Sequence, residues 1–75
     1  MIHLMQIMNH MLVTLEYSQN EIVEEFGYID SGEQTIDDLC YGIGIDLTVY
    51  QIERIEASLP KWKSALAVTR MKQVA

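Results

Sequence analysis

Few residues in this chain of 75 have the side-chain types and spacing that a catalytic or metal-binding site requires. Cys40 is the first candidate. A cysteine acts as a nucleophile when a nearby base or a helix N-terminus lowers its pKa. Cys40 instead follows Asp37 and Asp38 and lies beside Leu39, a setting that raises the pKa of a thiol. We therefore interpret Cys40 as a buried structural cysteine, and a lone thiol fits a reducing, cytoplasmic compartment.

Metal ligands are the next candidates. His3 and His10 are seven residues apart on one helical face, but the third protein ligand that a zinc site needs is not evident. The acidic segment from Asp30 onward resembles a calcium-binding EF-hand loop, yet Thr35 replaces the glycine at position six and Tyr41 the glutamate at position twelve. The sequence thus predicts no metal, no cofactor and, without a catalytic pair of groups, no enzyme.

Residues 35–56, TIDDLCYGIGIDLTVYQIERIE, have the order of a DNA-reading helix-turn-helix: a capped helix, a glycine and a second amphipathic helix. This segment holds five carboxylates and one arginine, whereas affinity for DNA comes largely from lysine and arginine. Only Gln51 and Arg54 have side chains suited to reading bases. Nucleic acid is therefore not the partner we expect. A helix-turn-helix transcriptional regulator that uses residues 35–58 with the basic C-terminal tail is the alternative function.

Charge divides the chain into three parts. Residues 1–15 hold no charged side chain besides histidine, residues 16–56 hold all 11 acids and one base, and residues 57–75 hold four bases and no acid. The formal net charge is −6. One interpretation is a solvated acidic face against which the basic C-terminal helix folds back, and the other is an acidic surface offered to a basic partner.

The second interpretation gives the function that we expect. It is a small acidic protein-protein interaction module, an adaptor, inhibitor or antagonist, that occupies a basic surface of a partner such as a nucleic-acid-binding protein. Small phage and plasmid regulators often act this way, but this is a comparison with a kind of protein and no motif in the chain shows it. The predicted partner-binding residues are the acids Glu21, Glu24, Glu25, Asp30, Glu33, Asp37 and Asp38.

The first expected helix, roughly residues 2–16, is apolar around most of its circumference. Such a helix is either central in a bundle or buried in an oligomer, and in so small a domain we expect a homodimer. The helix is too short and too polar to span a bilayer, so no membrane is expected. The predicted dimer interface is made of Leu4, Met5, Met8, Met11, Leu12, Leu15, Trp62, Leu66 and Met71.

Caps and glycines divide the rest of the chain. Ser18 and Glu21 form a capping box that begins a helix, and Gly27 is placed to stop it. After a turn with a positive φ at Gly32, Thr35 caps a third helix. The remaining boundaries are Gly42 and Gly44 at the end of that helix, Asp46 or Thr48 as the next cap, and Pro60, which ends the fourth helix or opens the fifth.

These elements predict an all-α fold: one domain over residues 1–75, a small bundle of four to five short helices, as an intertwined or side-by-side homodimer. One ambiguity stays open. Within residues 41–50 the apolar residues Ile43, Ile45, Leu47 and Val49 alternate, which is typical of a strand, so a short hairpin is the alternative there.

Overall fold

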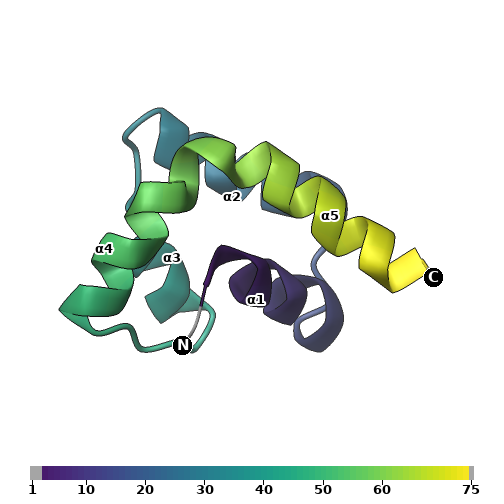
Figure 1. Ribbon diagram of the computed structural model, residues 1–75, viewed down its shortest axis with the longest axis horizontal. Coiled ribbons are helices and arrows are strands. Elements are labelled where there is room, and N and C mark those ends of the chain that lie inside the picture. Colours follow the sequence, from purple (N-terminus) through teal and green to yellow (C-terminus); the bar gives the residue numbers. More distant parts are fainter. Residues whose placement is uncertain (1–2, 75) are drawn as a thin grey trace.

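The computed structural model describes the backbone of residues 3–74 and side chains as far as Lys72. The described residues form the α-helices α1 (Leu4–Asn9), α2 (Gln19–Asp30), α3 (Ile36–Gly42), α4 (Val49–Ser58) and α5 (Trp62–Val74), which are labelled in Figure 1. A π-helical segment (His10–Thr14) continues α1, and a 3-10 turn (Leu59–Lys61) leads into α5. The all-α prediction is confirmed for residues 3–74, which include no strand, and residues 43–48 simply link α3 to α4.

The helices begin where local capping predicts. Ser18 Oγ accepts from the Glu21 N–H at 3.1 Å, and Glu21 Oε1 accepts from the Ser18 N–H at 2.9 Å. Thr35 Oγ1 accepts from the N–H of Asp38 at the start of α3. Thr48, and not Asp46, caps α4, because its Oγ1 accepts from the backbone N–H three residues later. Each cap satisfies a backbone donor that has no partner within the helix.

The prediction that Gly27 stops the second helix is wrong. α2 continues to Asp30, and the N–H of Ser31 still donates to the Gly27 carbonyl at 3.0 Å. The last turn packs Ile29 against the core, a gain from burial that exceeds the weak helix propensity of glycine. The turn comes at Gly32, whose φ of +82° confirms the predicted left-handed residue.

The first helix is shorter than expected. It ends at Thr14 rather than near residue 16, and its last turn is π-helical, with the Leu15 N–H donating to the His10 carbonyl at 3.1 Å. Glu16 then adopts a φ of +56°, and this left-handed residue turns the chain toward α2. Ile2, where we expected the helix to begin, lies outside the described residues.

The core is built around α1. In Figure 1, α1 lies below α5, with α3 and α4 to its left. Ile7, Met8 and Met11 have no exposed surface, and they meet Ile22 and Phe26 of α2 in the same cluster. Other buried members are Leu4, Ile36, Leu39, Cys40, Ile43, Ile55, Trp62 and Leu66. Of the two explanations for an apolar first helix, a central place in the bundle therefore applies within a single chain.

Candidate functional site

The predicted partner-binding acids occupy α2, the turn that follows it and the first turn of α3. We call this set the acidic surface, and its members are Glu21, Glu24, Glu25, Asp30, Glu33, Asp37 and Asp38. All are exposed except Glu25, which is half-buried. The structure thus leaves these carboxylates accessible along 18 consecutive residues, 21–38, although several have a role within the fold.

Three carboxylates of α2 hold local structure. Glu21 closes the capping box, and its bonds to the Ser18 N–H and hydroxyl lower the pKa of the Glu21 carboxyl. Glu24 Oε1 accepts from the Tyr28 hydroxyl at 3.0 Å, and this bond and the carboxylate charge raise the pKa of Tyr28. Glu25 Oε2 accepts from Gln34 Nε2 at 2.8 Å, which ties the turn after α2 back onto the helix.

Asp30 has a tertiary role that the sequence did not reveal. Its Oδ2 accepts from the indole N–H of Trp62 at 2.8 Å, across 32 residues of sequence. Trp62 is 4% exposed, and its ring stacks on Phe26 with centroids 5.5 Å apart. A buried indole N–H needs an acceptor, and a carboxylate is a strong one. Asp30 therefore joins the end of α2 to the first residue of α5.

Glu33, Asp37 and Asp38 differ from those four acids because their exposed side chains make no hydrogen bond within the part of the chain that the structure describes. Tyr41 lies one helical turn after Asp37 and Asp38, on the same side of α3. It is 81% exposed, more than any other large hydrophobic residue described. Sequence reasoning missed Tyr41, although its spacing from the two aspartates was the signal. An exposed aromatic ring beside carboxylates is a surface that can contact another protein.

The predicted dimer residues divide into two groups. Five of them, Leu4, Met8, Met11, Trp62 and Leu66, line the core of the single chain. Met5 and Leu12 are half-buried, Leu15 is 38% exposed and Met71 is 72% exposed. A side-by-side contact between folded chains would rest on the second group, because the side chains of the first group are almost fully buried.

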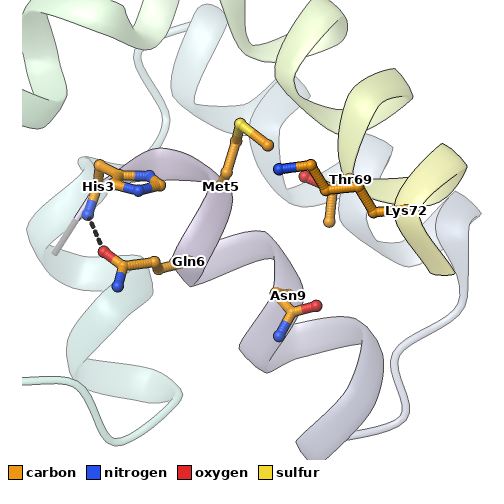
Figure 2. A pocket seen from close by; sticks show the side chains of 6 residues that line it. All are labelled: His3, Met5, Gln6, Asn9, Thr69 and Lys72. Carbon is orange, nitrogen blue, oxygen red and sulfur yellow. Dashed lines mark hydrogen bonds between the residues drawn. The ribbon is translucent and has the colours of Figure 1, made fainter.

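A hollow of about 390 Å³ lies between α1 and α5. Figure 2 shows its walls: His3, Met5, Gln6 and Asn9 from α1 and the turn before it, and Thr69 and Lys72 from α5. The hollow is open and chemically mixed. The His3 N–H donates to Gln6 Oε1 at 2.8 Å, and Thr69 Oγ1 donates to the Ala65 carbonyl at 2.8 Å. Its polar groups therefore serve the helices around it.

His10 and Cys40 each have a place within the fold, the first through a hydrogen bond and the second through burial. His10 Nε2 donates to the Ile43 carbonyl at 3.2 Å, so this ring joins the π-helical segment to the end of α3. Cys40 is buried as predicted, and burial together with the charge of Asp37 raises the pKa of its thiol to about 11. Among the described residues, no group of three histidine, cysteine or acidic side chains is placed to hold a metal ion.

The segment that resembles a helix-turn-helix forms α3, a six-residue link and α4. The two side chains suited to reading bases are engaged within α4. Gln51 Oε1 accepts from the Thr48 N–H at 2.9 Å, and Arg54 Nη1 donates to the Tyr50 hydroxyl at 3.0 Å. Glu53 and Glu56 are exposed on the same helix. The face that would approach DNA therefore carries negative charge, which phosphate repels.

No known protein family matches this chain, and neither the curated proteins nor the solved structures contain a similar one. None of the described helices combines the length and the apolar character that crossing a bilayer requires.

Proposed function

We propose that this chain is a protein-protein interaction module that binds a basic surface of its partner through the acidic surface and Tyr41. The observation that carries the proposal is the exposure of Tyr41, 81%, beside Asp37 and Asp38 on the outer side of α3. Tyrosine is enriched among the residues that contribute most to binding between proteins, because its ring buries a large area at a small entropic cost.

The carboxylates and the ring have different roles in this proposal. Exposed charges at the rim of an interface mainly steer encounter and exclude partners of the same sign. The ring supplies the contact that slows dissociation. Glu33, Asp37 and Asp38 are the acids that the proposal depends on most, since the other four also hold α2 or α5 in place.

The test is a pull-down from extracts of the cells that encode this chain, with two variants of equal net charge as bait. Glu33→Gln/Asp37→Asn/Asp38→Asn neutralises Glu33 and the two acids one turn before Tyr41, and Asp46→Asn/Glu53→Gln/Glu56→Gln neutralises three exposed acids near and on α4. We expect the first variant to associate more slowly with the captured partner and to lose part of its dependence on salt, while the second behaves as wild type. Tyr41→Ala should mainly speed dissociation. Equal behaviour of the two triple variants would show that the acidic surface is only solvated.

The alternative function, DNA binding by α3 and α4, is separated by a mobility-shift assay on mixed-sequence duplex DNA. A DNA-binding protein reaches a Kd on the order of 10⁻⁴–10⁻⁶ M on non-specific sites at physiological salt, and binds more tightly at low salt. We expect no shift at either salt concentration. A mobility shift that the substitution Arg54→Ala abolishes would favour the helix-turn-helix transcriptional regulator.

We also propose that two copies pair side by side through Met5, Leu12, Leu15 and Met71. These four residues of the predicted dimer interface keep solvent-accessible surface in the folded chain. Apolar side chains that keep exposed surface in a folded chain can mark an interface.

A further inference from the structure

A second groove, between α2 and α5, has the opposite charge to the acidic surface. Its floor is apolar and is formed by Val23 of α2 with Trp62, Leu66 and Ala67 of α5. Lys63 and Arg70 line it from α5, and Gln19 lines it from α2. No carboxylate contributes to these described walls, although the whole chain has a net charge of −6.

The floor of this groove is held rigidly. Trp62 is fixed by its stack on Phe26 and by its hydrogen bond to Asp30. The Lys63 ammonium lies over the indole ring, 5.6 Å from its centroid, so this charge is held at the groove. Val23 is 42% exposed and Ala67 is also exposed, which leaves the apolar floor open to a docking chain. Preorganisation of this kind lowers the entropic cost of binding.

The dimensions of the groove favour the side chains of a docked segment over a small molecule. Its volume is about 230 Å³, below the ~300–1,000 Å³ typical of small-molecule pockets. Lys63 and Arg70 are seven residues apart on α5, two turns of one face, so their Cα atoms are separated by about 10 Å along the axis. An α-helix that carries two carboxylates at the same spacing, beside an apolar stripe, matches both the floor and the charges.

We propose that this α2–α5 groove binds an acidic amphipathic helix of a partner protein. Its apolar side chains lie on Val23 and Ala67, and its carboxylates pair with Lys63 and Arg70. A second copy of this chain is a poorer occupant. Among the acids of its own described helices (Glu21, Glu24, Glu25, Asp30, Asp37, Asp38, Glu53 and Glu56), none lies seven residues from another within the same helix.

This surface differs from the one in the proposed function, because its charges have the opposite sign and its lining residues on α2 are Gln19 and Val23 rather than the acids. The two proposals together describe an adaptor that holds a basic surface on α2–α3 and an acidic helix on α2–α5. Either proposal can fail without the other.

The test uses synthetic helical peptides as probes and Trp62, the single tryptophan, as the reporter. Each peptide has one leucine face, with two glutamates seven residues apart, two glutamates four residues apart, or two lysines seven residues apart. We expect the first peptide to bind most tightly, to change Trp62 fluorescence and to shift the amide resonances of Val23, Leu66 and Ala67. Lys63→Glu/Arg70→Glu should weaken that binding about tenfold, as the loss of two charge pairs at a partly dry surface implies.

Two controls separate groove binding from general attraction. Lys61→Glu/Lys72→Glu changes the net charge equally on bases outside the groove and should leave the affinity unchanged. Ala67→Arg adds a positive charge but fills the groove, so it should weaken binding, whereas general attraction would make it strengthen binding. Equal weakening by the two double variants, tighter binding by Ala67→Arg, or no response of Trp62 to any peptide would overturn the proposal. Binding to anionic phospholipid vesicles in the absence of peptide binding would also overturn it, in favour of a membrane surface.

Discussion

The carboxylate of Asp30 shows how one exposed acid can hold two helices together. Its bond to the Trp62 indole is the recorded side-chain hydrogen bond between α2 and α5. Asp30 is among the partner-binding residues predicted from the sequence, and its second role was not foreseen. From the sequence, nothing distinguishes it from its neighbours, because its partner lies 32 residues away.

Asp30→Ala should lower the free energy of unfolding by about 1–2 kcal/mol, since a buried indole donor loses its acceptor. Urea unfolding followed by Trp62 fluorescence measures this change. Glu33→Ala removes an exposed acid three residues later and should change stability by less than about 0.5 kcal/mol. Equal effects of the two variants would mean that the Asp30 bond adds nothing to stability.

Cys40 makes a prediction about pH. Burial, and secondarily the charge of Asp37, raises the pKa of its thiol to about 11 in the folded chain. A thiol in the unfolded chain titrates at about 8.5, so the unfolded state loses its proton first as the pH rises. The stability that the neutral thiol contributes is therefore complete below about pH 8.5 and is lost between there and pH 11.

The measurement compares urea midpoints at pH 7.5 and pH 10 for the wild type and Cys40→Ala. Every other ionisable group is present in both proteins, so the difference between the pH dependences of their stabilities isolates the thiol. We expect wild type to lose more stability than the variant. A thiol reagent at neutral pH should also react slowly with the folded chain and rapidly in urea, and fast reaction with the folded chain would contradict a buried neutral thiol.

At the scale of elements, the sequence predicted what is local and missed what is tertiary. Ser18, Thr35 and Thr48 cap helices through bonds to backbone groups three residues later, so short patterns suffice to find them. Gly27 was misjudged because burial of the turn beyond it outweighs its propensity. The apolar circumference of α1 was recognised, but only the fold shows that its own chain covers it. The α2–α5 groove joins residues 19–23 to 62–70, which no local pattern links.

The glycines test this account of the elements. A Cβ at Gly27 meets no atom within 4 Å, and Gly27 lies inside α2, so Gly27→Ala should stabilise the chain by about 0.5–1 kcal/mol. Gly44 also has open space but has a φ of +82°, so Gly44→Ala should destabilise it by about 1–2 kcal/mol through strain alone. Thermal or urea unfolding of both variants measures whether each substitution raises or lowers the stability of the chain. Destabilisation by Gly27→Ala would mean that α2 does not continue through this residue.

At the scale of the whole molecule, the charges are separated rather than mixed. The acids extend from α2 to α4, and Lys61, Lys63, Arg70 and Lys72 lie on or next to α5, all exposed. The recorded side-chain contacts of Arg54 and Lys63 are with the rings of Tyr50 and Trp62, not with carboxylates. This separation favours two surfaces of opposite sign over a basic helix that neutralises an acidic face.

The proposed homodimer is the prediction that concerns the whole molecule. Met8 is fully buried, so an acid there would unfold each chain and could not report on pairing. Met71 is a sharper probe, because it is 72% exposed on α5, and Val49 is a matched control at 73% exposure on α4, outside the proposed seam.

We expect light scattering of the wild type at micromolar concentration to give twice the chain mass of 8.6 kDa. Met71→Glu should return the mass to that of one chain while circular dichroism stays helical, because a charge buried at the seam has no partner there. Val49→Glu should remain dimeric. A wild-type mass of one chain across the micromolar range would reject pairing, and the core that closes around α1 within one chain would then account for the stability of the fold by itself.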